Sequence, residues 1–408
     1  MSLTLRNAIL AENPHQTVDV KVVGEKIVEI GSGLSSSERD IDLEGRLLIP
    51  GFVETHIHLD KSCILHRCSS KRGDLEEAIS EVARVKGAFT AQDVYDRAMG
   101  TLKKCIVNGT TRMRTHVEVD PVVGMNGYEG VKAAIKDVRW ALDAEICVFP
   151  QEGLLNNPGT DELMVAALKD GAGSVGAAPY TDSNPHGQID RIFEMAREFD
   201  VDIDMHLDFG DDASALDAEY VCKKANEFGW GGRVAIGHVT KFSVLEPQHL
   251  ATVGKMLADS GVAVTVLPST DLFLMHRDFD HKTPRGVTLV HKLLEYSVNC
   301  SLSTNNVLNP FTPLGDCSLI RMANLYANIA QIGKMETMAE CLNMVSTRSA
   351  KLLNLADYGL EVGMAADLVA IDNNSPAMAV AELSQPLYGF KRGLPTFTRP
   401  LPEVHGPR

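Results

Sequence analysis

The 408-residue sequence predicts an α/β fold: a (β/α)8 TIM barrel with a small β-sandwich formed by the N- and C-terminal segments. Two observations predict the barrel. Eight strand-like segments follow one another between residues 52 and 304, and helical stretches fill all seven gaps between them. This alternation is typical of parallel strands that are connected by helices. The sandwich is predicted by strand patterns at both chain ends, since neither end has enough strand to bury a sheet face alone.

The predicted barrel strands are short segments rich in apolar and β-branched residues. They span Phe52–His58, Thr111–Val119, Glu145–Phe149, Ser174–Pro179, Val201–Leu207, Arg233–His238, Val262–Leu267 and Val298–Thr304. The helical stretches are Asp74–Lys86 with Ala91–Val107, Tyr128–Ala144, Asp161–Asp170, Gln188–Phe199, Ala213–Phe228, Leu245–Ser260 and Arg285–Tyr296, and Leu319–Ile332 follows the last strand. Because chemistry in this architecture lies at the carboxyl ends of the strands, residues at those ends are the candidates for a site.

The two terminal segments carry the remaining strand patterns. The first contains Leu3–Leu5, Thr17–Val23, Lys26–Ile30, Ile41–Leu43 and Arg46–Ile49, and the second contains Leu368–Ile371, Leu387–Phe390 and Pro395–Thr398. Glycine and proline residues separate these patterns, as expected of turns. We therefore predict a composite β-sandwich of residues 1–50 plus 355–408 and a metal-dependent barrel of residues 51–354.

Composition narrows the classes of function. The net charge of −15 argues against a nucleic-acid or anionic-membrane surface. No stretch approaches the 18 apolar residues of a membrane span, and Arg6 interrupts the first apolar run, so neither a membrane helix nor a secretory signal is expected. The 8 cysteines are scattered without a CxxC pair, which is typical of a reduced, cytoplasmic protein. We expect a small-molecule substrate. The sequence leaves open whether the chain forms a homo-oligomer.

The segment Pro50–Lys61 carries the strongest chemical signal. Glu54, His56 and His58 alternate with apolar residues, so both imidazoles lie on one face of the predicted strand. Two polar rings on one face of a buried strand need partners, and a shared metal ion would supply them. The pattern therefore predicts a metal site in preference to a pair of core histidines.

The chain resembles the amidohydrolase superfamily and, within it, the cytosine deaminase-like branch. The matching segments extend over nearly the whole chain: Pro50–Lys61, Arg114–Val119, Val148–Gly153, Ile203–His206, Gly237–His238, Pro284–Thr288, Pro313–Gly315 and Ala350–Val369. His58–Ser62 is also similar to the isopropylammelide amidohydrolases of triazine breakdown. The resemblance implies a metal-dependent hydrolase, a deaminase or amidohydrolase, that cleaves a C–N bond of a small nitrogen heterocycle such as a cytosine-like or triazine-like compound.

The resemblance also implies roles for individual residues. His56, His58 and His206 would bind one divalent metal ion, zinc or iron, both of which suit imidazole ligands. Three neutral imidazoles leave one coordination position open for water, and such a site can lower the pKa of that water to about 7. His238 would contact the water or the substrate, and Gln151 would hydrogen-bond the substrate ring.

Four further residues are candidates with open alternatives. Phe311 stands where the family has an aromatic lid residue, a tryptophan, and Asn306 is a candidate for substrate contact. Lys61 could anchor the substrate or be a solvated loop lysine. His116 could face the barrel interior as packing. The sequence His116-Val117-Glu118 also fits the H-x-E half of base-flipping zinc deaminases, but the sequence lacks their P-C-x-x-C half, which excludes that class.

Two positions depart from the pattern of the family. Asn305 stands where the eighth strand of the family ends in an aspartate that touches the metal and takes a proton from water, and an amide cannot be a general base at neutral pH. Phe209 stands where cytosine deaminases carry a proton-shuttling glutamate. His238 could instead accept the water proton. Asp208 could shuttle protons, or it could belong to an acidic surface loop.

These departures leave three interpretations open. The chain could be a hydrolase with altered acid/base residues, a catalytically degenerate homologue that acts as a binding protein, or the catalyst of a non-hydrolytic metal-assisted reaction such as hydration or isomerisation. Losing one positioned acid or base typically costs about 10²–10⁴ in rate, so we expect weak or absent cytosine deamination. Metal content separates the second interpretation from the others, and amine release separates the first from the third.

Overall fold

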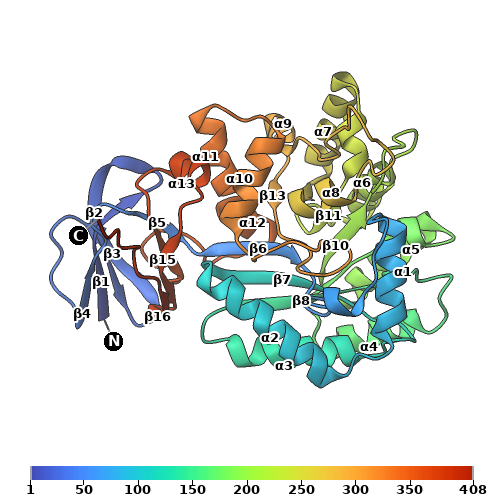
Figure 1. The fold of residues 1–408 in the computed structure, drawn as a ribbon, viewed down its shortest axis with the longest axis horizontal. Coiled ribbons are helices and arrows are strands. Elements are labelled where there is room, and N and C mark those ends of the chain that lie inside the picture. Colours follow the sequence, from blue (N-terminus) through green and yellow to red (C-terminus); the bar gives the residue numbers. More distant parts are fainter. Residues whose placement is uncertain (1, 407–408) are drawn as a thin grey trace.

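The computed structural model describes residues 2–406, which form a helix-covered barrel and a separate β sheet at one end of it (Figure 1). Eight parallel strands follow one another in sequence order around the barrel. They are β6 (Phe52–Ile57), β7 (Thr110–Glu118), β8 (Asp143–Phe149), β9 (Ser174–Val175), β10 (Asp202–Leu207), β11 (Val234–His238), β12 (Val262–Val266) and β13 (Cys300–Leu302). The predicted α/β barrel is therefore confirmed.

The barrel closes between β6 and the residues that follow β13. The backbone N–H of His58 donates to the carbonyl of Asn305 at 2.9 Å, and the N–H of Asn305 donates to the carbonyl of His56 at 2.9 Å. Earlier on β6, the backbone N–H of Thr55 donates to the Ser303 hydroxyl at 3.0 Å. This seam places Asn305 beside the two histidines of β6.

Helices cover the outside of the barrel. They are α1 (Leu75–Lys86), α2 (Ala91–Val107), α3 (Asn126–Val138), α4 (Thr160–Lys169), α5 (Pro185–Phe199), α6 (Asp217–Phe228), α7 (Pro247–Ser260), α8 (Pro268–Leu274), α9 (Val290–Leu293), α10 (Leu319–Ile329), α11 (Met335–Asn343) and α12 (Thr347–Leu352). The predicted helix Arg285–Tyr296 is wrong in its first part, because Gly286 has a φ of 65° and lies outside helical geometry. The sequence patterns also missed α8, which has only seven residues.

The second sheet unites both ends of the chain. Its strands are β1 (Ser2–Leu10), β2 (Asn13–Val23), β3 (Lys26–Gly31), β4 (Arg39–Asp42), β5 (Leu47–Pro50), β14 (Leu368–Ile371), β15 (Pro386–Lys391) and β16 (Leu394–Thr398). They follow the order β16-β15-β14-β5-β1-β2-β3, with β4 beside β1. Strand β5 pairs antiparallel with β14, so that Leu48 lies opposite Ala370. The predicted pairing of the two chain ends is confirmed.

The junction between this sheet and the barrel is tight. A Cβ atom at Gly51 would lie 2.2 Å from Cγ2 of Thr111, so the turn from β5 to β6 accepts only glycine. Buried Lys391 lies 2.6 Å from the Asp367 carboxylate, which also accepts from Nε of Arg112 at 2.9 Å. A further helix, α13 (Pro376–Ala381), packs against α11 of the barrel. The division into residues 1–50 plus 355–408 and 51–354 stays a prediction.

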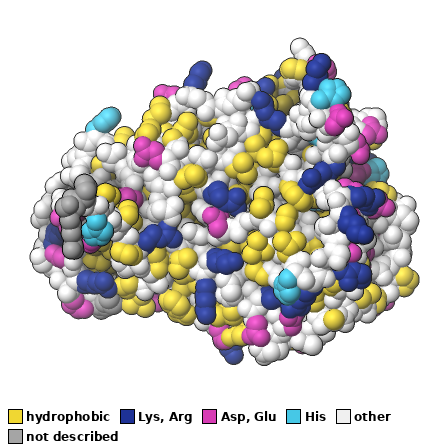
Figure 2. Space-filling view, viewed as in Figure 1, with side chains coloured by type: hydrophobic (Ala, Val, Ile, Leu, Met, Phe, Trp, Pro, Cys, Tyr) yellow, Lys and Arg dark blue, Asp and Glu magenta, His cyan; other side chains and the backbone are white. Residues whose placement is uncertain are grey.

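The surface carries both apolar and charged side chains. On the face shown in Figure 2, hydrophobic side chains are interspersed with basic and acidic ones over the sheet and the barrel. Among residues 2–406, no helix is long and apolar enough to span a membrane.

Candidate metal centre and substrate cavity

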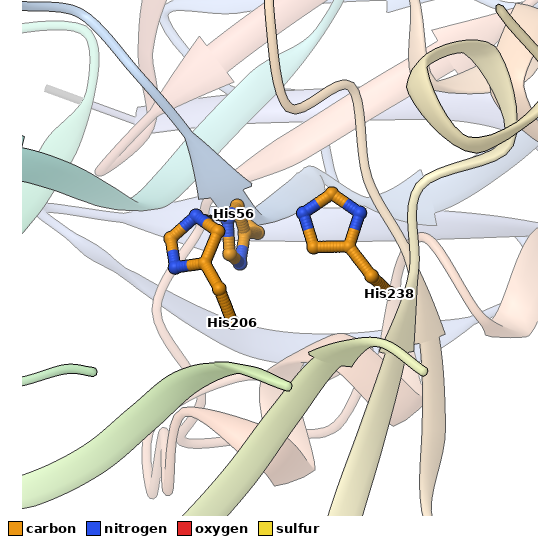
Figure 3. A group of neighbouring side chains, drawn as sticks. All are labelled: His56, His206 and His238. Atoms are coloured by element: carbon orange, nitrogen blue, oxygen red, sulfur yellow. Dashed lines mark hydrogen bonds between the residues drawn. The ribbon is translucent and has the colours of Figure 1, made fainter. Parts of the chain in front are cut away.

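Three histidines from two barrel strands meet at the carboxyl end of the barrel. Nε2 of His206, on β10, lies 3.0 Å from Nε2 of His56 and 3.1 Å from Nε2 of His58, at the end of β6. Figure 3 shows His56 and His206 beside His238, the last residue of β11. The structure thus brings the predicted ligand set together. The ring nitrogens of His56, His206 and His238 offer a group of ligand atoms within 4.8 Å of one another.

The protonation of these rings fits a cation between them. Burial lowers the pKa of His56 to about 3, with His116 adding to the effect, and burial lowers the pKa of His58 and His206 well below the usual value. Each neutral imidazole has a single N–H. Nε2 of His206 faces two other Nε2 atoms, and one N–H cannot satisfy both close contacts. A metal ion that accepts the three lone pairs would satisfy them, and this donor set suits zinc or iron.

A layer of charged groups lies beneath His56. The Asp204 carboxylate lies 3.7 Å from Nδ1 of His56 and 3.5 Å from Nε2 of His116. Arg114 donates to the same carboxylate at 3.1 Å. Burial would raise the pKa of Asp204, but His116, His56 and the Arg114 guanidinium lower it. His116 stacks on His56 with ring centroids 3.7 Å apart, so it packs under the site rather than lining the cavity.

His238 has a carboxylate partner in the segment that follows the next barrel strand, β12. Its Nδ1 lies 2.6 Å from Oδ1 of Asp271, a fully buried residue of α8. The second oxygen of Asp271 accepts the backbone N–H of Leu267 at 3.1 Å, which holds the carboxylate in place. A carboxylate accepts a hydrogen bond from Nδ1–H, so the neutral ring carries its proton on Nδ1 and has a free lone pair on Nε2. His238 also has a φ of 69°, an uncommon backbone conformation of the kind found at functional sites.

Asn305 lies where the seam of the barrel meets the histidines. Its φ of 61° is a left-handed conformation that asparagine tolerates better than most residues. The side chain is buried, and no partner within residues 2–406 reaches hydrogen-bond distance of its Oδ1 atom. Its neighbour Asn306 accepts from Nδ2 of Asn309 at 2.6 Å. Both asparagines line the cavity.

A narrow cavity opens in front of the histidines. Its lining combines polar strand-end residues with aromatic and aliphatic walls: His58, Lys61, Leu75, Gln151, Tyr180, His206, Phe209, His238, Thr270, Leu274, Asn305, Asn306 and Phe311. The Phe209 ring lies edge-on to His238, with centroids 5.2 Å apart. Outside this lining, Phe149 stacks on His206 at 4.6 Å. A flat ring of a few atoms suits such a cavity.

Lys61 and Gln151 meet at one side of the cavity. Lys61 is 1% exposed, so it is not the solvated loop lysine of the alternative interpretation. Its Nζ donates to Oε1 of Glu118 at 2.8 Å and to Oε1 of Gln151 at 2.9 Å. It also lies 4.8 Å from the centroid of the Phe311 ring. The structure therefore gathers Lys61, Gln151 and Phe311 in one wall.

Asp208, a predicted catalytic residue, does not line the cavity. Its carboxylate accepts the backbone N–H groups of Asp217 and Ala218, at 2.9 and 3.0 Å, at the start of α6. Burial raises its pKa to about 6 against the lowering effect of these two hydrogen bonds. This arrangement is that of a helix cap. Phe209, not Asp208, turns towards the histidines.

Sequence reasoning missed several residues of the site. Asp271 lies in the undetected α8, and Tyr180 lies in a 3-10 turn (Pro179–Thr181) after the two-residue strand β9. Lys86 closes α1 and reaches Glu118, the last residue of β7. Only the placement of these residues relative to the barrel strands could have indicated them, because each follows a strand or faces one across a loop.

Comparison with known proteins places the chain in a family. The model of the amidohydrolase family, Amidohydro_3, matches residues 39–144 and 125–393. N-isopropylammelide isopropyl amidohydrolase from Pseudomonas sp. (strain ADP) is 27% identical over 400 residues, covering 96% of each chain. Pterin deaminase from Rhizobium rhizogenes is 26% identical over 336 residues, covering 80% of this chain and 75% of its own.

A solved structure gives the same result. The crystal structure of 5-methylcytosine deaminase from Klebsiella pneumoniae liganded with 5-fluorocytosine superposes with a TM-score of 0.94 at 26% identity, covering 99% of each chain. The predicted resemblance to cytosine deaminase-like and isopropylammelide-type enzymes is thereby confirmed. The chain belongs to the amidohydrolase family, a family of hydrolytic enzymes.

Proposed function

We propose that the protein is a metal-dependent hydrolase that replaces an amino or alkylamino group of a small nitrogen heterocycle, cytosine-like or triazine-like, with an oxo group. The observation that carries this proposal is the convergence of three buried imidazoles beside a narrow cavity, with Nε2 of His206 within 3.1 Å of Nε2 of both His56 and His58. The relatives named above act, by their names, on rings of this kind.

His56, His58 and His206 would hold one divalent metal ion, zinc or iron. When bound, the ion supplies Lewis-acid activation of water. Asp204 then has a positioning role, because its carboxylate lies beside Nδ1 of His56 and restrains the ring from behind. The remaining chemistry belongs to the protein side chains.

The proton acceptor in this proposal is His238. Asn305 cannot accept a proton at neutral pH. The Asp271 carboxylate keeps the proton of His238 on Nδ1 and leaves Nε2 free towards the cavity. Nε2 takes a proton from the attacking water, the ring carbon gains an oxygen, and the C–N bond breaks. His238 then returns this proton to the departing amine, and the second proton of the water passes from the oxygen to a ring nitrogen, so the carbon carries an oxo group and the proton count balances.

Asn305 and Asn306 act as hydrogen-bonding groups. The Oδ1 atom of Asn305, which has no hydrogen-bond partner within residues 2–406, can accept a hydrogen bond from water or from the leaving amine. Asn306 presents its amide group to the ring, and Phe311, Phe209 and Tyr180 enclose it and exclude water. Because the Asp208 carboxylate caps α6, we assign proton transfer to His238.

A second candidate function is that of a metal-binding homologue without hydrolytic activity. The observation that favours it is Asn305 itself, which stands in place of a carboxylate. Both candidates predict metal binding, and only the first predicts amine release. For either function we propose a cytoplasmic location, because the cysteines are scattered and free of disulfide bonds.

The test combines metal content with product release. Elemental analysis of purified protein should give about one zinc or iron per chain, and His56→Ala or His206→Ala should lose it. The control His249→Ala replaces an exposed histidine of α7 and should retain the metal. Metal-loaded protein should release ammonia or alkylamine from a panel of amino-oxo pyrimidines, pterins and triazines. Full metal occupancy in both variants would exclude the site, and metal binding without amine release from any compound would favour the second candidate.

A further inference from the structure

A buried network of charges lies behind the Lys61–Gln151 wall of the cavity. The Lys86 ammonium, 1% exposed, lies 3.0 Å from Glu118, 2.5 Å from Asp120 and 2.6 Å from Glu152. Glu118 divides its carboxylate between the two lysines, with Oε1 on Lys61 and Oε2 on Lys86. Three carboxylates thus hold Lys86 in place, and Lys86 holds Glu118.

This network determines which atoms of Gln151 face the cavity. A lysine ammonium has only N–H groups to offer, so the Gln151 atom 2.9 Å from Lys61 is the amide oxygen. The amide NH₂ is not used by Lys61 and remains for the cavity, which Gln151 lines together with Tyr180. Lys61 uses two of its three N–H groups on Glu118 and Gln151, and the third is left for the cavity. This wall therefore presents hydrogen-bond donors.

We infer that Glu118, supported by Lys86, is a specificity-determining residue: it fixes Lys61 and Gln151 as donors, so that this wall accepts an oxo group of the substrate ring and rejects an amino group. The inference rests on the proposed function, since it concerns the same cavity. Glu118 does not line the cavity, and it acts through Lys61 as a positioning residue.

Charge supports the same conclusion. Among the described residues that line the cavity, Lys61 is the one with a permanent charge, and none is a carboxylate. Burial would raise the pKa of Glu118, but the Lys61 and Lys86 ammonium groups outweigh burial and lower it to about 2. An exocyclic amino group placed against this wall would meet N–H groups with its own N–H groups, and both would be left unpaired in a buried site.

The experiment compares two ligands that differ at one substituent. Metal-loaded protein is titrated by calorimetry with pyrimidin-2-one and with 2-aminopyrimidine, while ammonia is monitored to exclude turnover. We expect the wild-type protein to bind the oxo compound about 10–100-fold more tightly, the effect of leaving buried donors unpaired. Equal binding, or tighter binding of the amino compound, would overturn the inference and leave the proposed function intact. Binding of neither compound would overturn the inference, while amine release from the substrate panel decides the proposed function separately.

Variants then assign the preference to the network. Glu118→Gln should reduce the preference to less than about threefold, because a neutral amide cannot hold two ammonium groups and Gln151 becomes free to flip. Lys86→Arg should keep the preference, since a guanidinium can pair with the same carboxylates. Glu76→Gln, an exposed change in the same region of the chain, is the control. If Glu118→Gln folds poorly, Lys86→Met provides the second variant. Retention of the full preference in a folded Glu118→Gln or Lys86→Met protein would contradict the inference.

Discussion

His238 donates through Nδ1 to Asp271 at 2.6 Å, and both residues lie within the buried carboxyl end of the barrel. In the proposed function, this pair supplies the base that Asn305 cannot be. The carboxylate also accepts from the backbone of Leu267, so it is fixed before any substrate enters. The proposed proton transfer depends on this contact.

Asp271→Asn should lower kcat by about 10²–10⁴, because an amide can offer its NH₂ to Nδ1 and leave the proton of His238 on the wrong nitrogen. KM and metal content should change little, since Asp271 contacts neither the ring-binding wall nor the metal ligands. Steady-state amine release with metal analysis measures both. The control is Asp280→Asn, an exposed aspartate that follows α8 in the chain. An unchanged kcat in Asp271→Asn would remove His238 from the role of proton acceptor.

Asn305→Asp addresses the missing aspartate directly. If the His238–Asp271 pair already supplies the base, the new carboxylate should change kcat by less than about tenfold. A gain of about 10² or more on any substrate would instead show that the native site lacks a competent base, since restoring one is worth about 10²–10⁴. A panel assay for amine release resolves these outcomes, and Asn306→Asp is the matched control for an added charge in the same loop.

Metal binding should stabilise the folded chain. A ligand that binds only the folded state at 100 times its Kd adds about 2.7 kcal/mol to the free energy of unfolding, so zinc should raise the melting temperature of metal-free protein by a few degrees. His206→Ala should lose this shift and His249→Ala should keep it. Thermal unfolding with and without zinc measures the difference. A shift of the same size in His206→Ala would place the bound metal elsewhere.

The stability of the segment after β6 should depend on pH through Asp93. The two nitrogen atoms of the Arg67 guanidinium lie 2.6 and 2.9 Å from its carboxylate, and this pairing lowers the pKa of Asp93 to about 2. The folded pKa lies below the unfolded value of about 3.9, so the stabilisation is present above that value and is lost as the pH falls towards 2.

We therefore expect Asp93→Asn to reduce the free energy of unfolding by about 1 kcal/mol at pH 6, after allowance for partial solvent exposure, and by progressively less below about pH 4. Urea unfolding at several pH values measures this difference. The control is Asp96→Asn, which replaces an exposed aspartate of the same helix. A destabilisation that stays constant from pH 6 to pH 3 would show that the charge of Asp93 is not its cause.

The sequence predicted the barrel and the positions of the candidate metal ligands, because both depend on local patterns. Alternation in β6 places His56 and His58 on one face, and the strand ends place His206 and His238 near them. The pairing of β5 with β14 was also predictable, since neither terminal segment can bury a sheet face alone. These inferences needed only periodicity and the topology of the fold.

The other parts of the site depend on contacts between distant segments. Asp271 meets His238 across 33 residues through a helix too short to give a periodic pattern, and Lys86 meets Glu118 across 32 residues. Asp208 follows a strand end just as Asn305 does, yet its carboxylate turns to the start of α6. The direction of a side chain after a strand is set by the packing of its neighbours, which no local pattern contains.

The most direct test of the central claim is hydrolysis in ¹⁸O-labelled water by metal-loaded wild-type protein. With an amino-oxo heterocycle from the panel, mass spectrometry should find one ¹⁸O atom in the ring product for each amine released. Release should fall by about 10² or more in His206→Ala or His238→Ala and persist in His249→Ala. Protein that binds about one metal ion per chain but yields no labelled product and no amine from any compound would contradict the claim that this site is hydrolytic.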